Sequence, residues 1–96
     1  MKFIYKERYL KRFDRFPRHE QVLIHEANRQ IRAYYITRQA SIGLGIKLLH
    51  THGSEKVFEA RASQSIRIVW TQRKELVSFV LVGLHDEVKQ YLRSLR

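Results

Sequence analysis

The clearest pattern in the chain is an alternation in which every second residue is apolar, in two runs between positions 58 and 70. Apolar side chains occupy every second position in two successive runs: Phe58, Ala60, Ala62 and then Ile66, Ile68, Trp70. A period of two is typical of strands with one buried face. Residues 76–82, LVSFVLV, are almost entirely apolar, which indicates an inner strand covered on both faces. Gly83 ends that run, so we expect three strands and a closing helix over residues 56–92.

The turn between the first two of these strands sets their register. For both apolar faces to coincide, paired residues must lie on the same side of the sheet. A three-residue loop pairs Ala62 with Ile66 and Arg61 with Arg67, whereas a two-residue loop would set Ala62 against Arg67. We therefore expect Arg61 and Arg67 to lie opposite each other on the face away from the core. Two like charges placed so are unfavourable, and either Glu59 or a bound phosphate would compensate them.

Helical spacing dominates the first forty residues. Residues 2–5 read as a short edge strand, and the apolar positions that follow are Tyr9, Leu10, Phe13 and Phe16. Pro17 ends that helix, and a second helix is expected over residues 17–37 with an apolar stripe of Ile24, Ala27, Ile31, Tyr34 and Tyr35. Two helices joined at one proline predict an αα-hairpin that covers the sheet. Residues 40–53 are less regular, and their IKLLH stretch indicates an extended arm leading into the first long strand.

Together these elements predict an α+β fold. An N-terminal strand and an αα-hairpin pack on a small, mainly antiparallel sheet, and a C-terminal helix closes it. The sequence has neither internal repeats nor a linker-like segment, so residues 1–96 are expected to form a single domain.

Charge narrows the choice of partners. The chain has 19 Lys and Arg against 9 Asp and Glu, a net charge of +10. A basic surface on a small domain points first to nucleic acid, then to an acidic protein or a membrane. No apolar run reaches the roughly 18 residues that span a bilayer, and no secretory signal is evident. The lack of cysteine excludes disulfides and thiolate metal sites. We expect a cytoplasmic protein without a membrane partner.

Six side chains could act on a phosphate: Lys47, His50, Arg61, Arg67, His85 and Tyr91. Cleavage of RNA by its own 2′-hydroxyl needs a base, cations on the phosphate and an acid for the leaving oxygen. Arginine suits the phosphate, and histidine suits proton transfer. Each residue could instead belong to an ordinary solvated surface. By strand parity His85 falls on the core side, unless Gly83 introduces a bulge or the chain turns there.

A metal site is not expected. His50 and His52 should share one side of a strand, and His85 with Asp86 could complete a site. However, no thiolate or helical histidine pair reinforces the pattern. The sequence also lacks a glycine-rich phosphate loop and a nucleophile elbow.

Several motifs resemble the RelE/ParE superfamily of bacterial and archaeal toxins. They are an aromatic residue followed by E-x-R at 58–61, the I-R-I strand that ends in Trp70, and the V-G-x-H-D-E sequence at 82–87. The I-K-L-L segment at 46–49 is similar to the lead-in of that family. His85 stands where some members have arginine or tyrosine, and Leu84 interrupts the double histidine of others. The likeness covers roughly residues 40–92, and the helical hairpin matches by pattern only.

The resemblance implies the toxin of a toxin–antitoxin system, an endoribonuclease that cuts mRNA in the ribosomal A site without metal or cofactor. Its partners would be the ribosome, mRNA and a cognate antitoxin, with which it would form a hetero-oligomer. Carried over by position, the catalytic residues are Lys47, His50, Arg67 and His85, and the phosphate-binding residues are Lys47, Arg61, Arg67 and Tyr91.

Two other functions remain open at this point. A ParE-like inhibitor of DNA gyrase would bind a protein and cleave nothing. A non-enzymatic RNA-binding domain would need exposed aromatic side chains on its strands. Trp70 falls on the core face in the register above, which disfavours that reading.

Overall fold

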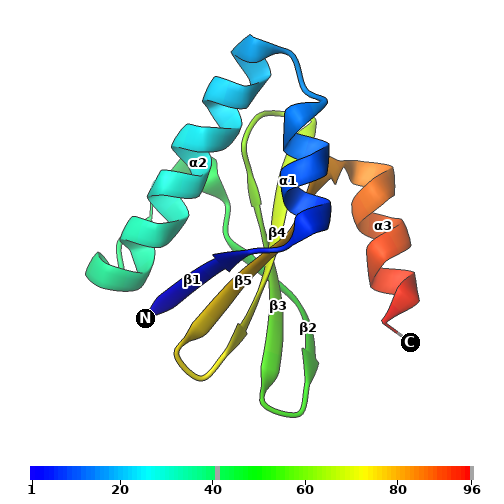
Figure 1. Ribbon diagram of the computed structural model, residues 1–96. Helices are drawn as coiled ribbons and strands as arrows, with labels where there is room; N and C mark the ends of the chain where they lie inside the picture. Colours follow the sequence, from blue (N-terminus) through cyan, green and yellow to red (C-terminus); the bar gives the residue numbers. More distant parts are fainter. Residues whose placement is uncertain (41, 96) are drawn as a thin grey trace.

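A five-stranded sheet forms the centre of the structure, and helices cover both of its faces (Figure 1). The computed structural model describes residues 1–40 and 42–95. The strand order is β1-β5-β4-β3-β2, with β1 parallel to β5 and the other neighbours antiparallel. The strands are β1 (Lys2–Tyr5), β2 (Lys47–His52), β3 (Glu55–Arg61), β4 (Ile66–Arg73) and β5 (Leu76–Leu84). The helical elements are α1 (Glu7–Asp14), α2 (Arg18–Thr37), the 3₁₀ turn η1 (Ile42–Leu44) and α3 (His85–Ser94).

The predicted α+β fold is confirmed, with one refinement. Residues 47–52, expected as an extended arm, form a full edge strand that pairs antiparallel with β3. Within the part of the chain that the structure describes, no helix combines the length and apolar character needed to cross a bilayer.

The larger core lies between the sheet and the α1–α2 hairpin. The alternating residues of β3 and β4 point into it as predicted, with Ala60, Ile66, Ile68 and Trp70 buried. The stripe of α2 supplies the opposing surface: Ile24, Ala27, Ile31 and Tyr35. Leu10 was expected on the buried side of α1 and is instead exposed, because α1 turns Tyr9, Phe13 and Phe16 toward the sheet.

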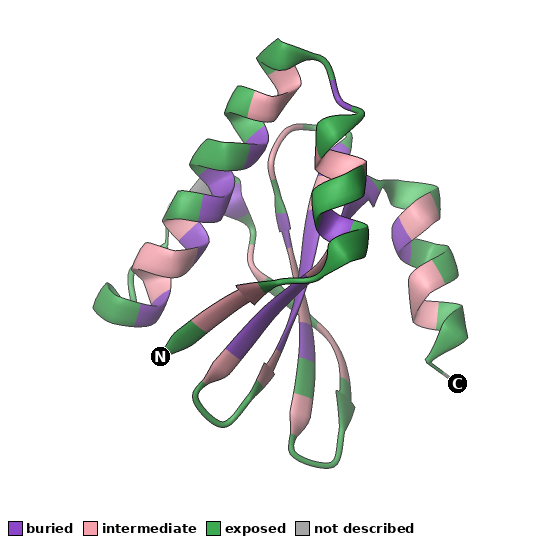
Figure 2. Ribbon diagram, in the orientation of Figure 1, coloured by how far each residue is buried: buried purple, intermediate pink, exposed green. Residues whose placement is uncertain are grey.

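A smaller core lies under α3 on the opposite face. Val88 of α3 packs against Val57, Val69 and Leu81. Figure 2 shows buried positions running along the central strands and on the sides of the helices that face them. The inner strand predicted for residues 76–82 is therefore covered on both faces.

A bulge in β5 allows that strand to serve both cores. Val69 pairs with Leu81 while Trp70 pairs with Phe79, which leaves Val80 as the extra residue. Beyond a bulge the alternation of faces shifts by one position. Phe79 and Val82 consequently both face the α1–α2 hairpin. The parity problem of His85 is resolved by this bulge at Val80, rather than one at Gly83, and by the chain leaving the sheet at His85 to begin α3.

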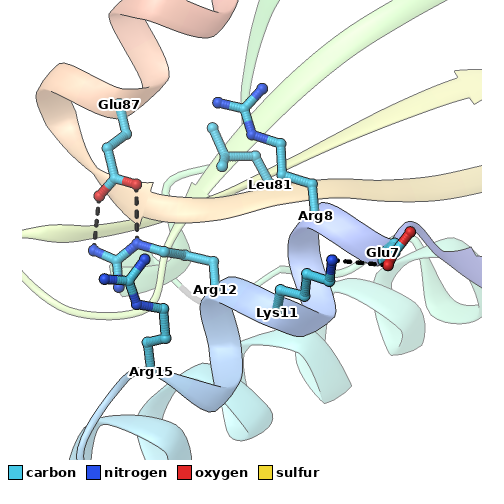
Figure 3. A pocket seen from close by; sticks show the side chains of 7 residues that line it. All are labelled: Glu7, Arg8, Lys11, Arg12, Arg15, Leu81 and Glu87. Atoms are coloured by element: carbon cyan, nitrogen blue, oxygen red, sulfur yellow. Dashed lines mark hydrogen bonds and ion pairs between the residues drawn. The ribbon is translucent and has the colours of Figure 1, made fainter.

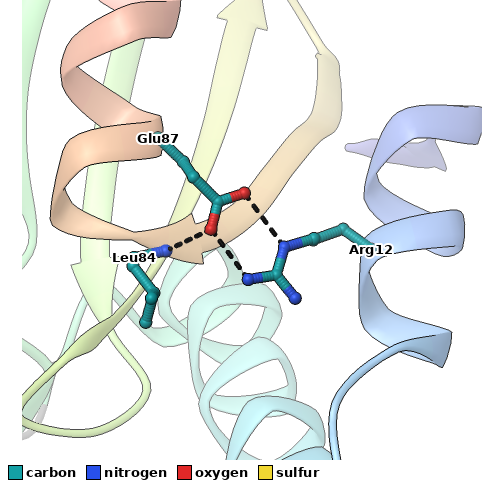
Figure 4. A network of polar contacts seen from close by, with 3 residues as sticks. All are labelled: Arg12, Leu84 and Glu87. Carbon is teal, nitrogen blue, oxygen red and sulfur yellow. Dashed lines mark hydrogen bonds and ion pairs between the residues drawn. The ribbon is translucent and has the colours of Figure 1, made fainter.

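Glu87 ties α3 to α1 (Figure 4). Arg12 donates to its carboxylate twice, from Nε to Oε2 at 2.9 Å and from Nη2 to Oε1 at 2.8 Å. The backbone N–H of Leu84 donates to Oε1 at 3.1 Å, so the same carboxylate caps the start of α3. The hydrogen bonds from Arg12 hold the pKa of Glu87 below its usual range, and the hydrogen bond to Glu87 raises the pKa of Arg12.

Gly83 provides the space in which the Glu87 carboxylate lies. A Cβ at this position would be 2.9 Å from Cδ of Glu87 and 3.0 Å from each carboxylate oxygen. Ordinary contacts between heavy atoms are about 3.5 Å. Any side chain larger than hydrogen would therefore push the carboxylate away from Arg12.

Replacing Glu87 by glutamine should lower the free energy of unfolding by roughly 1 kcal/mol at neutral pH. We expect a modest effect because 24% of the Arg12 side chain and 32% of the Glu87 side chain remain exposed to solvent. Since the folded-state pKa of Glu87 is depressed, the stabilisation is complete above the unfolded pKa of about 4.3. It is lost as the pH falls through the lower folded-state value. Urea unfolding from neutral to acid pH should show the difference between the two proteins narrowing in acid.

The matched control is Glu7→Gln, which removes an ion pair to Lys11 whose two side chains are 79% and 75% exposed. This variant should unfold almost like the wild type. A difference for Glu87→Gln that stays constant with pH would contradict the assigned role of the ion pair.

Gly83→Ala should destabilise the protein by displacing the Glu87 carboxylate, and it should do so only while that carboxylate is present. In a Glu87→Ala background the added methyl group has room, so Gly83→Ala should there cost much less. A double-mutant cycle of thermal or urea unfolding measures this coupling. Additive effects of the two substitutions would show that Gly83 is needed for some other reason.

Candidate functional site

The β3–β4 turn places Arg61 and Arg67 directly opposite each other, as the register predicted. The turn is closed by the backbone N–H of Ala62, which donates to the Ile66 carbonyl at 2.9 Å. Arg67 alternates along β4 with residues that face the α1–α2 hairpin. Arg67 therefore belongs to the sheet face that carries α3. The side chain of Arg61 lies at the edge of the sheet beside Gly45, where it lines a pocket together with Leu44 and residues of α2.

The turn itself compensates the charge of Arg67. Its Nη1 donates to the Gln64 carbonyl at 2.9 Å and to the Ser63 carbonyl at 3.3 Å. Glu59, which we considered for this role, forms no ion pair with either arginine among the described residues. The two carbonyls fix the direction of the guanidinium and leave its Nε and Nη2 donors for another acceptor.

Lys47 and His50 lie on the same sheet face, in edge strand β2. Lys47 pairs with Glu59 of β3, and His50 pairs with Val57, which packs under α3. The rings of His50 and His52 are stacked, with centroids 6.5 Å apart and planes 8° apart, so the two imidazoles share one side as predicted. Lys47 is exposed and His50 is half-buried.

The two predicted residues of α3 lie in different places. His85 is exposed and begins the helix directly after Leu84, whose sheet partner is Ile66, next to Arg67. Tyr91 is farther along α3, where it is half-buried beside the Val57–Val69–Leu81 cluster. Burial raises the pKa of Tyr91, the charge of Glu55 raises it further, and Arg8 opposes both. Because Glu55 begins β3 and Arg61 ends it, Tyr91 belongs to the far end of this face.

We call Lys47, Arg61, Arg67 and His85 the sheet-face cluster, whereas His50, opposite Val57, belongs to the far end of the face with Tyr91. Lys47 lies across β3 from Val69, two residues along β4 from Arg67. With adjacent strands about 4.8 Å apart and a rise of about 3.3 Å per residue, the backbones of Lys47 and Arg67 are roughly 12 Å apart. Lys47, Arg61 and His85 are exposed, which makes the cluster an open surface. It offers cations for a phosphate together with the imidazole of His85 for proton transfer.

A second basic concentration was not predicted from the sequence. A cleft of about 390 Å³ lies between α1 and α3 and is lined by Glu7, Arg8, Lys11, Arg12, Arg15, Leu81 and Glu87 (Figure 3). The available signal was the spacing of Arg8, Arg12 and Arg15, which places all three on one face of a helix.

Comparison with known proteins supports the fold through structure alone. No protein-family model and no curated protein sequence matches the chain. A chain of the archaeal RelE–RelB complex from Pyrococcus horikoshii OT3 superposes with a TM-score of 0.68 at 10% identity, covering 86% of this chain and 92% of that one. The YoeB/ParE toxin from Agrobacterium tumefaciens gives 0.62 at 17% identity, with coverages of 88% and 99%. The YoeB dimer structure from Staphylococcus aureus gives 0.65 at 9% identity, with coverages of 88% and 97%. The chain thus has the fold of the RelE/ParE superfamily of toxins.

Proposed function

We propose that this chain is the toxin of a toxin–antitoxin pair and that it cleaves mRNA in the ribosomal A site without a metal ion or cofactor. The observation that carries the proposal is the sheet-face cluster, in which Arg61 and Arg67 lie opposite each other beside the start of α3, where His85 is exposed. Proteins of the same fold have been crystallised as toxin–antitoxin complexes, RelB–RelE from Methanococcus jannaschii and DinJ–YafQ from E. coli. Action on ribosomes places the protein in the cytoplasm.

In the proposed reaction the 2′-hydroxyl of the RNA attacks the adjacent phosphorus, and the bond from phosphorus to the 5′-oxygen breaks. The products are a 2′,3′-cyclic phosphate and a 5′-hydroxyl. Arg67 and Arg61 stabilise the charge that develops on the phosphate oxygens, and Lys47 adds a third cation. His85 protonates the leaving oxygen, and water accepts the proton of the 2′-hydroxyl.

The fixed direction of Arg67 matters most for this chemistry. A guanidinium held by two turn carbonyls needs little reorganisation when the phosphate arrives. A net charge of +10 also favours an acidic antitoxin that covers the basic face and blocks access of RNA.

The test is cleavage of mRNA programmed on ribosomes, mapped by primer extension. The wild-type protein should give discrete cuts within the A-site codon. Arg67→Ala and His85→Ala should each weaken these cuts by on the order of tenfold or more, because each removes a group that acts on the transition state.

Matched controls are available within the chain. Arg73→Ala removes an exposed arginine from the same strand and face as Arg67, and His19→Ala removes an exposed histidine from α2. Both should cleave like the wild type. If folded wild-type protein makes no cuts in the mRNA, the nuclease assignment is wrong. Inhibition of DNA gyrase would then be the activity to assay.

A further inference from the structure

The cleft between α1 and α3, which we call the α1–α3 cleft, contains more cations than carboxylates. Its lining carries Arg8, Lys11, Arg12 and Arg15 against Glu7 and Glu87. Both carboxylates are already paired, Glu7 with Lys11 at 3.0 Å and Glu87 with Arg12 at 2.8 Å. Figure 3 shows these two pairs, with Arg8 and Arg15 extending from α1 outside them. Among the described residues, neither Arg8 nor Arg15 has a carboxylate partner.

The two unpaired arginines are arranged along one helix face. They are seven residues apart, which is about 10 Å along the axis of α1 at roughly 1.5 Å per residue. The guanidinium carbon of Arg8 lies 5.8 Å from the centre of the Tyr91 ring, and this contact orients it. Arg12, between them, is held over the Phe16 ring at 4.3 Å and neutralised by Glu87. The cleft therefore presents the oriented guanidinium of Arg8 and the guanidinium of Arg15 in addition to a neutral pair.

We propose that the α1–α3 cleft is a second phosphate-backbone site, which binds an RNA strand outside the sheet-face cluster. The inference rests on the proposed function in one respect, since it takes RNA to be the ligand. A guanidinium fork matches the oxygens of a phosphate.

The apolar content of the cleft favours RNA over an acidic protein segment. Leu81 is the apolar residue of the lining, and only 1% of its surface is exposed. The other lining residues are all charged, whereas the core of a protein–protein interface is largely formed by apolar and aromatic residues. The cleft also shares α3 with the sheet-face cluster, because the helix carries His85 at its start and Glu87 in the same turn.

The experiment measures binding of a short oligouridylate whose 2′-hydroxyls are all methylated, so that it cannot be cleaved. Arg8→Gln/Arg15→Gln should weaken binding about tenfold at low salt. It should also reduce the slope of log K against log salt by roughly 1.4, since each phosphate contact on a single strand contributes about 0.7. Arg12 is left unchanged because it holds α3 in place.

The matched control is Arg18→Gln/Arg93→Gln, which removes two exposed helical arginines that do not line the cleft. It should leave the salt slope unchanged and weaken binding by no more than about threefold. Equal losses in the two double variants would overturn the proposal, because net charge alone would then explain them. So would unchanged RNA binding by Arg8→Gln/Arg15→Gln. If that variant instead loses affinity only for a glutamate-rich peptide, the cleft serves an acidic protein and the proposal is wrong.

The outcome is independent of the nuclease assay. A methylated strand reports binding whether or not the protein cleaves RNA. Loss of binding through Arg8 and Arg15 in a protein that makes no cuts would support the cleft and remove the proposed catalysis. Normal mRNA cleavage by the wild type, together with unchanged RNA binding by Arg8→Gln/Arg15→Gln, would support the proposed catalysis and contradict the cleft as an RNA site.

Discussion

The position of α3 depends on one carboxylate. Glu87 receives both donors of the Arg12 fork and the N–H of Leu84, so a single side chain joins α1, the end of β5 and the start of α3. Geometry of this kind is bidentate and charge-assisted, which makes it stronger than a neutral hydrogen bond and more directional. It requires that nothing larger than hydrogen project from position 83. His85 belongs to the same helical turn, so the interaction that anchors the helix also determines where that imidazole lies.

The bulge at Val80 is the second constraint, because it lets one strand serve two cores. Without it, Phe79 and Val82 would point to opposite faces, and one of them would leave the core under the hairpin. A shift of one residue in a strand exchanges every side chain between faces. Because of this bulge, Gly83 pairs with Arg67 and faces the side of the sheet on which Glu87 of α3 lies. The bulge at Val80 therefore determines that Gly83, and not a larger residue, lies under the Glu87 carboxylate.

Much of the fold follows from local pattern. The alternation at 58–70 gives the strands and their buried face, and the requirement that both faces coincide gives the Arg61–Arg67 pair. The parts that could not be read from sequence depend on contacts between distant residues. Arg12 and Glu87 are 75 positions apart, and nothing near either one specifies the other. The bulge at Val80 lies within an unbroken apolar run, where no change in residue type marks which position is extra. The separation of Tyr91 from Arg67 likewise depends on the direction in which α3 crosses the sheet.

The many positive charges of the chain repel one another in the folded state, and specific contacts reduce this repulsion at two arginines. Like charges repel in the folded state more than in the extended chain, so a net charge of +10 opposes compactness. Arg67 is relieved by turn carbonyls and Arg12 by Glu87, which removes two of the closest conflicts. Arg8, Arg15 and Arg61 have no carboxylate partner among the described residues. Unpaired arginines are better explained by an anionic ligand than by stability, because surface ion pairs would have reduced their mutual repulsion.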